Sequence, residues 1–155
     1  MDESKSLQDQ FAPKLICFGC GPANELGLQI KSFVQGDRVF ASFAPKSHHQ
    51  AFQGMINGGI IGALLDCHMN WTAAWQLMIA NESDVPPCTV TAEYKVGFKA
   101  PTPSETTLEL EAWVVQSSQR KAIVEATLSA AGDVTATGHG IFVAVKEGHP
   151  AFHRW

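Results

Sequence analysis

The sequence predicts an α+β domain in which one long helix packs against one curved antiparallel sheet of about six strands, in the order ββαββββ. The helix is predicted from residues 54–80, GMINGGIIGALLDCHMNWTAAWQLMIA, which are apolar on nearly every side from Gly59 to Ile79. A helix that is apolar all round is buried, so this one should form the core. Apolar runs on both sides of it, joined by short connections, predict the antiparallel strands.

Two strands are expected before the helix. Leu26–Phe33 and Val39–Ala44 are rich in apolar residues and flank Gln35-Gly36-Asp37-Arg38, whose Gly and Asp are typical of a hairpin turn. Residues 1–25 are expected to form a loose or short helical lead-in followed by a loop rich in glycine and proline. Residues 45–54 are predicted to be a polar loop that leads into the helix.

Four strands are expected after the helix, which Pro86-Pro87 should stop. Their connections are short, which favours antiparallel neighbours over crossover helices. Residues 26–146 are therefore predicted to form a single domain, followed by a tail at 147–155. The predicted strands are Cys88–Phe98, Thr106–Gln116, Ala122–Ala130 and Val134–Val145.

Charge and composition argue against nucleic acid binding, secretion and membrane insertion. The net charge is −4 and the lysines and arginines form no basic stripe, so no nucleic acid partner is expected. The N-terminus is polar and lacks the apolar segment of a secretory signal. The long helix contains Asp66, His68 and Asn70, which argues against a membrane span. A cytoplasmic protein is the expectation.

The cysteines do not predict a metal site. Cys17, Cys20, Cys67 and Cys88 are expected to be reduced, because a chain of 155 residues without a secretory signal is not a small disulfide scaffold. Cys17-x-x-Cys20 has the spacing of half a zinc site, but no second pair along the sequence completes four ligands. We therefore expect no metal and no cofactor.

Asp66 is the first candidate for chemistry. It carries the only formal charge between Lys46 and Glu82. An ionised carboxylate in an apolar setting costs several kcal/mol unless it is partnered, so its presence in the core helix needs a reason. Catalysis is one such reason.

The start of the helix is the second candidate. Asn57 is a good N-cap residue, and Gly58 and Gly59 allow another molecule to approach the backbone closely. Free N–H groups at this end, together with the helix dipole, suit a developing oxyanion or a phosphate. The alternative is a plain capped helix whose glycines make a packing contact.

These residues resemble the hotdog-fold acyl-CoA thioesterases, in particular the group related to the phenylacetic-acid-degradation thioesterase. That family has His-Gly-Gly at the start of its central helix and an acid nine residues after the His, a spacing that Asn57-Gly58-Gly59 and Asp66 keep. The family's strand that bears Thr or Ser and ends in an aromatic residue and a proline is matched by residues 91–101, and residues 17–28 resemble the opening of one subgroup. Two positions differ from the family: Asn57 replaces the usual His, and Ala51 stands where some members have a functional Asn.

The resemblance implies hydrolysis of an acyl-CoA or related thioester. Asp66 would be the general base or the nucleophile, and the Gly58 N–H, with or without that of Gly59, would be the oxyanion donor. Thr91 would orient Asp66 or the water. Thr89 shares its strand face and is the alternative.

Other roles stay open at the level of sequence. His49 is close enough in sequence to substitute for the missing groups and contact the substrate, although a loop histidine is more often simply solvated. A non-catalytic module that binds acyl thioesters, or a hotdog hydratase or dehydratase, remains an alternative function. The hydratase would need a His near the helix start, where Asn57 stands.

Helix geometry predicts a shared site. Gly59 and Asp66 are seven residues apart, which corresponds to about 10 Å along a helix, so one chain does not bring both to the same carbonyl group. Two copies related by a twofold axis would close this gap. We therefore expect a homodimer with shared active sites, and the resemblance implies that a dimer of dimers is also possible.

Overall fold

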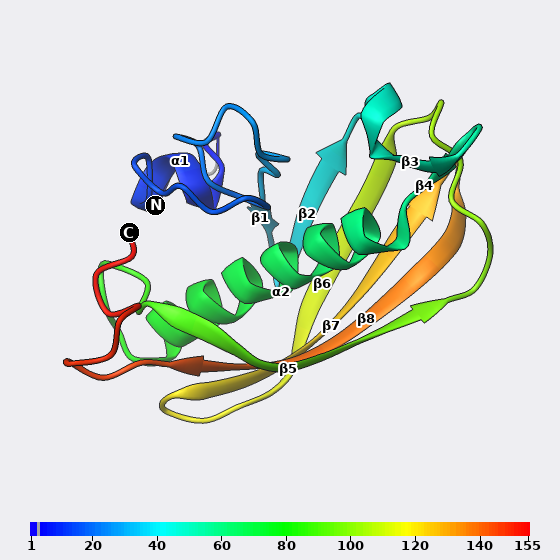
Figure 1. Ribbon diagram of the computed structural model, residues 1–155. Coiled ribbons are helices and arrows are strands. Elements are labelled where there is room, and N and C mark those ends of the chain that lie inside the picture. The colour runs from blue at the N-terminus through cyan, green and yellow to red at the C-terminus, as the bar shows by residue number, and fades with distance from the viewer. Residues whose placement is uncertain (3) are drawn as a thin grey trace.

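The computed structural model describes residues 1–2 and 4–155. One long helix lies across one face of a six-stranded antiparallel sheet (Figure 1), which confirms the predicted fold class. The helix bounds agree with the prediction to within one residue at each end. The elements are α1 (Leu7–Phe11), β1 (Phe33–Gln35), β2 (Arg38–Phe43), the 3-10 turn η1 (Ser47–His49), β3 (Gln50–Phe52), β4 (Met55–Ile56), α2 (Gly58–Ala80), β5 (Thr89–Phe98), β6 (Leu108–Ser117), β7 (Lys121–Ala130) and β8 (Asp133–Ala144).

The strand order in the sheet is β1-β2-β6-β7-β8-β5, and every neighbouring pair is antiparallel. After α2, the chain forms β5 at the edge of the sheet opposite β1, where it pairs with β8. β5 therefore pairs on one side only and is a ten-residue edge strand. A long unpaired edge presents backbone N–H and C=O groups that a further strand can use.

The core lies between α2 and the inner face of the sheet. Leu64, Leu65 and Met69 of α2 are fully buried there. Glycines on β8 let the helix approach closely, because a Cβ at Gly138 would lie 3.0 Å from Met69 Cε. The sheet contributes alternate residues, as a half-buried sheet requires. The inward residues of β6 and β7 include Leu108, Leu110, Ala112, Val124, Ala126 and Leu128.

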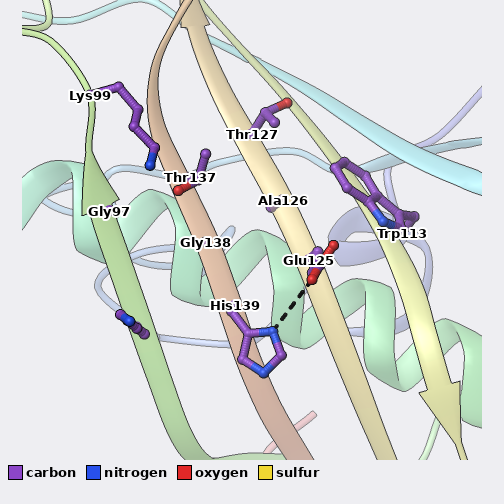
Figure 2. A pocket seen from close by; sticks show the side chains of 10 residues that line it. Gly97, Lys99, Trp113, Glu125, Ala126, Thr127, Thr137, Gly138 and His139 are labelled. Carbon is purple, nitrogen blue, oxygen red and sulfur yellow. Dashed lines mark ion pairs between the residues drawn. The ribbon is translucent and has the colours of Figure 1, made fainter.

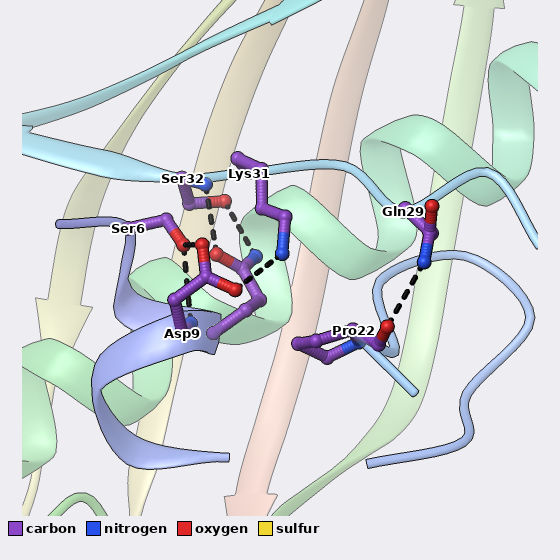
Figure 3. A network of polar contacts seen from close by, with 7 residues as sticks. Ser6, Asp9, Pro22, Gln29, Lys31 and Ser32 are labelled. Atoms are coloured by element: carbon purple, nitrogen blue, oxygen red, sulfur yellow. Dashed lines mark hydrogen bonds and ion pairs between the residues drawn. The ribbon is translucent and has the colours of Figure 1, made fainter. Parts of the chain in front are cut away.

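The N-terminal lead-in belongs to the same core, with Leu7 and Leu15 buried in it. Figure 3 shows how polar side chains hold it in place. The Ser6 hydroxyl oxygen accepts a hydrogen bond from the Asp9 N–H and so caps α1. Asp9 also forms an ion pair with Lys31 across the 22 residues that separate them.

A buried hydrogen-bonded chain connects the lead-in to α2. The Ser32 N–H donates to Gln8 Oε1, and Gln8 Nε2 donates to Ser32 Oγ at 3.0 Å. Since His68 Nε2 lies 3.1 Å from the carbonyl oxygen of Val39, it must be the protonated nitrogen, and His68 Nδ1 accepts from Ser32 Oγ at 2.9 Å. Burial lowers the pKa of His68 to about 4, so the ring is neutral and structural.

One predicted strand is wrong. Residues 26–32 are not in the sheet, and β1 begins only at Phe33. The Leu28 N–H donates to Phe18 O and the Ile30 N–H to Gly19 O, so this segment pairs with an irregular loop instead of a strand. Gln29 has φ of 52°, which interrupts the extended backbone. Leu28 and Ile30, two of the apolar residues that suggested a strand, are buried, but they contact the core from a loop.

The segment before α2 also differs from the prediction. The expected polar loop 45–54 contains η1 and the strand β3, which pairs with β4 to form a small hairpin outside the main sheet. Within the residues that the structure describes, no helix is both long enough and apolar enough to cross a bilayer.

Candidate active site

One face of α2 lies under the edge strand β5. The residues on this face repeat every fourth position, which is the spacing that aligns side chains along a helix. β5 runs in the opposite direction to α2 above them. The facing pairs are Gly58 with Phe98, Gly62 with Tyr94, Asp66 with Thr91, and Asn70 with Thr89.

Asp66 lies in this row, half-buried, and accepts a hydrogen bond of 2.7 Å from Thr91 Oγ1 at Oδ1. Its pKa is raised above the ordinary value, mainly because burial disfavours the charged form. The hydrogen bond from Thr91 and the charge of Arg154 oppose that shift, while Cys17 adds to it. The result is a carboxylate that is a better proton acceptor than an exposed one, as a general base requires.

The two candidate threonines have different partners. Thr91 contacts the acid, whereas Thr89 is fully buried and donates to Asn70 Oδ1. Asn70 Nδ2 in turn donates to Thr91 Oγ1 at 3.4 Å, a long hydrogen bond. Because Thr91 accepts from Asn70, its own hydrogen is directed at Asp66. Sequence reasoning missed Asn70, although its position four residues after Asp66 placed it on the same helix face.

At the start of α2, the two candidate oxyanion donors are not equivalent. Asn57 Oδ1 accepts hydrogen bonds from the Gly59 N–H at 2.8 Å and from the Ile60 N–H at 3.3 Å. Asn57 is thus the N-cap of the helix and already occupies the Gly59 donor. The Gly58 N–H has no hydrogen-bond partner among the described residues, and Gly58 is exposed. It remains available to a ligand.

His49 is directed into its own loop. The ring is buried beside Phe43 at 5.4 Å between centroids, and its Nδ1 accepts a hydrogen bond from the Lys46 N–H. Burial lowers the pKa of His49, so the ring is neutral at pH 7. The His49 carbonyl oxygen accepts from the Asn57 N–H at 2.9 Å. His49 therefore holds the loop that positions the helix start.

An apolar groove of about 460 Å³ opens at the helix start. Gly58 lines it, and so do Phe52 and Phe98, which are 66% and 58% exposed. Asp66 is not part of the lining. A concave apolar surface next to a free backbone donor suits a ligand with a flexible chain. The other lining residues are Ala51, Met55, Ile56, Ile61, Lys99, Ala100, Pro101 and Thr102.

A second hollow, of about 450 Å³, lies on the opposite face of the sheet. Figure 2 shows it with α2 behind the strands. Lys95, Lys99 and Trp113 line it, together with an ion pair of 3.7 Å between His139 Nδ1 and Glu125 Oε1. The sheet separates this hollow from Asp66, so the two belong to different surfaces of the molecule.

The C-terminal tail, whose role could not be predicted from the sequence, packs close to Asp66. Arg154 Nη1 donates to the carbonyl oxygen of Thr89 at 3.1 Å, and the charge of Arg154 lowers the pKa of Asp66. Trp155 stacks on the buried ring of Trp71 with 4.7 Å between centroids. The tail thus covers the part of α2 that follows Asp66.

Three thiols meet beside Asp66, where the lead-in loop packs on α2. Cys17 and Cys20 come from the lead-in loop and Cys67 from α2, and their sulfur atoms all lie within 4.8 Å of one another. Hydrogen bonds from the Cys20 and Cys67 thiols hold the pKa of Cys17 well below its usual range, and the Cys17 sulfur raises the pKa of Cys20 to about 12. The sequence pointed to Cys17 and Cys20 as a pair but gave no sign that Cys67 joins them.

Comparison with known proteins shows the family to which the chain belongs. Residues 53–137 match the Thioesterase superfamily. A thioesterase superfamily protein from Shewanella loihica PV-4 is 34% identical in sequence, with a TM-score of 0.65 over 81% of this chain and 98% of that one. No curated protein sequence matches.

Two more distant structures share the fold. One is a putative thioesterase from Ralstonia eutropha JMP134, described as phenylacetic acid degradation-related, with 16% identity and a TM-score of 0.63 over 76% of this chain and 86% of that one. The other is the E. coli PaaI protein from the phenylacetic acid degradation operon, with 13% identity and a TM-score of 0.63 over 77% of this chain and 81% of that one.

Proposed function

Because the chain belongs to the thioesterase superfamily, with the hotdog fold, we propose that it hydrolyses an acyl-CoA thioester to the free acid and the CoA thiol. One observation carries the proposal. Asp66 of α2 is a half-buried carboxylate with a raised pKa and accepts a hydrogen bond from Thr91 of β5, and the Gly58 N–H at the start of the same helix has no hydrogen-bond partner among the described residues. A base for water and a donor for the oxyanion are the two groups that thioester hydrolysis needs.

In the proposed reaction, Asp66 takes a proton from a water molecule, and the resulting hydroxide attacks the thioester carbonyl carbon. The carbonyl oxygen becomes an oxyanion that the Gly58 N–H and the N-terminal dipole of α2 stabilise. The C–S bond then breaks, and the thiolate leaves as the thiol after taking a proton. Alternatively, Asp66 attacks the carbonyl itself, and water hydrolyses the mixed anhydride.

Thr91 acts as a positioning residue in this scheme. Its hydrogen bond fixes one oxygen of the Asp66 carboxylate, which leaves the other free to face water. Asn57 contributes by capping the helix and by holding the Gly59 N–H, so that the unpaired donor is the one at Gly58. Gly59, His49 and Thr89 then support the site without contacting the reacting atoms.

One chain does not assemble this site by itself. Gly58 and Asp66 are eight residues apart on a straight helix, which corresponds to about 12 Å. The groove at the helix start contains Gly58 and not Asp66. A second copy of the chain supplies the missing half if its Asp66 reaches the Gly58 donor of the first.

The open edge of the sheet is where such a copy would bind. β5 has no partner on its outer side, and the exposed residues 92–95 lie at its middle. Gly62 lies midway between Gly58 and Asp66, and Tyr94 of β5 lies over Gly62. A twofold axis near Tyr94 would pair β5 with the same strand of the partner and place Asp66 opposite the partner subunit's Gly58. We infer a homodimer with two equivalent sites, and a dimer of dimers stays a prediction.

The groove indicates where the substrate chain binds. Its apolar lining beside Gly58 suits an acyl chain or the pantetheine arm of CoA, whose thioester carbonyl would then lie at the helix start. A cytoplasmic location also stays a prediction.

The direct test is an assay of the purified protein with a panel of acyl-CoAs and a free-thiol reagent. We expect thiol release, faster than the uncatalysed rate and dependent on Asp66. Hydration of an unsaturated acyl-CoA without thiol release would show a hydratase instead. Binding without any turnover would show a thioester-binding module, which the replacement of the family's His by Asn57 favours as the second candidate.

A further inference from the structure

Three cysteine sulfurs converge at one point beside the candidate site. Cys17 lies at the start of a tight loop, Cys20 at its end, and Cys67 on α2, immediately after Asp66. The Sγ atoms of Cys17 and Cys67 are 3.8 Å apart. The loop is packed directly on the helix, because a Cβ at Gly19 would lie only 2.3 Å from Cys67 Sγ. Glycine is needed here for close approach.

We propose that Cys17, Cys20 and Cys67 bind a zinc ion as three thiolate ligands. In a tetrahedral site with Zn–S distances of about 2.3 Å, neighbouring sulfurs lie about 3.8 Å apart. The Cys17–Cys67 distance already has this value, and all three sulfurs lie within 4.8 Å of one another. No metal was expected from the sequence, because only pairs of ligands close together along the chain were considered. Cys67 is 47 residues from Cys20 and joins the other two cysteines only in the folded chain.

A hydrogen-bond donor contacts one of the sulfurs, as in thiolate metal sites. Trp71 Nε1 donates to Cys20 Sγ at 3.3 Å. Such donors stabilise thiolates and orient metal ligands. The Gly21 N–H donates to the Cys17 carbonyl oxygen at 2.8 Å, which closes the loop between the two ligands into a turn.

A metal site accounts for this arrangement better than simple packing or a disulfide does. A disulfide joins two sulfurs and leaves the third without a role, whereas here all three are mutually close and Cys20 Sγ accepts a hydrogen bond from Trp71 Nε1. Cys20 and Cys67 are buried and Cys17 is half-buried, so solvent reaches the cluster from the Cys17 side. Water or a small thiol would complete the coordination there. The ion would tie the lead-in loop to the turn of α2 that carries Asp66.

The test uses the full-length protein, purified and reduced under anaerobic conditions and then stripped of metal. Co²⁺ is the probe, because thiolate coordination gives it sulfur-to-metal charge-transfer absorption. We expect one Co²⁺ per chain, displaced by one equivalent of Zn²⁺. Cys17→Ser, Cys20→Ser and Cys67→Ser should each weaken Zn²⁺ binding at least about tenfold. Cys88→Ser is the matched control, because Cys88 lies outside the cluster, and it should bind like the wild type.

A second measurement does not depend on the variants folding. Alkylation of the native wild-type protein should modify Cys17, Cys20 and Cys67 slowly with Zn²⁺ present and faster without it, whereas the rate at Cys88 should not respond. The proposal is overturned if the wild type gives no charge-transfer band, if Cys67→Ser gives the same band, or if a disulfide within the cluster forms in place of metal binding. None of these readouts uses a thioester, so the result is independent of the proposed hydrolase activity.

Discussion

The two faces of α2 differ in the side chains that they carry and in their roles. The face toward the middle of the sheet carries large apolar residues such as Leu64, Leu65 and Met69, and it is completely closed. The face toward β5 carries Gly58, Gly62, Asp66 and Asn70, and it meets the unpaired edge of the sheet. The first face stabilises the fold. The second brings small and polar groups to the place where a substrate and a second subunit have access.

Truncation on the closed face should give the largest loss of stability. Leu64→Ala removes a fully buried side chain between helix and sheet, and we expect the free energy of unfolding to fall by about 2–5 kcal/mol. Urea denaturation measures this. The folded fraction should keep kcat/KM within a few-fold of the wild type, and a selective loss of activity would mean that the two faces are not separable.

Substitution on the face of α2 toward β5 should lower activity and leave stability unchanged or higher. Asp66→Asn should lower thioester turnover at least about a hundredfold, or about 2.7 kcal/mol in activation free energy, because the base is lost. Stability should stay equal or rise, since a desolvated carboxylate is removed. Asp84→Asn, at an exposed position, is the control and should behave like the wild type. Normal turnover in Asp66→Asn would remove Asp66 from the mechanism.

Subunit mixing tests whether the open face is completed by a partner. Asp66→Ala lacks the acid, and Gly58→Pro lacks the N–H donor, so neither variant should be active. Random co-refolding of equal amounts makes half of the dimers mixed, each with one intact site, and should restore about a quarter of wild-type activity.

Each parent must first be shown to fold and dimerise. Gly58→Ala is the matched control, because it keeps the N–H and its Cβ would meet the Phe98 ring at an ordinary 3.4 Å. Mixtures that contain mixed dimers but stay inactive would show that the site is built within one chain.

Substitutions of the two threonines on β5 should distinguish a residue that positions Asp66 from one that only stabilises the fold. Thr91→Val should lower turnover about tenfold. It should also move the acid limb of the pH–rate profile to higher pH, because the lost hydrogen bond lowered the pKa of Asp66. Thr89→Val should instead cost about 1–3 kcal/mol of stability by leaving Asn70 unsatisfied. Unshifted pH profiles in both variants would contradict the role of Thr91.

The last expected effect is in the closed interior and develops only as the pH falls below 6.5. His68 has a folded pKa of about 4 against an ordinary value of 6.5, so the unfolded chain binds more protons between these values. Its contribution to stability is complete above pH 6.5 and is lost as the pH falls toward 4, by at most about 1.4 kcal/mol per pH unit. Asp66, whose pKa is raised, contributes with the opposite sign. The difference between Asp66→Asn and Asp66→Asn/His68→Asn in urea midpoints isolates the histidine, and a difference independent of pH would contradict its assignment.

Local patterns were sufficient to predict α2 and the strands β2 and β5 to β8. The continuous apolar run gave α2 to within one residue at each end, and the alternation in residues 106–116 identified β6, because side-chain periodicity is a property of the local backbone. The fixed spacing of Gly58 and Asp66 on that helix also followed from the sequence alone. The family resemblance was confirmed by the match of residues 53–137 to the Thioesterase superfamily.

Contacts between distant segments were decided by the tertiary structure alone. The apolar residues between Leu26 and Phe33 could not distinguish a strand from a loop that packs on the core, because the difference lies in which backbone groups accept the N–H donors of this segment. Likewise, only the packing of the lead-in loop on α2 brings Cys67 to Cys17, and only the register of β5 on α2 assigns Thr91 to Asp66 and Thr89 to Asn70. Sequence periodicity determines which face a residue occupies, but the residue it meets there depends on how the whole chain folds.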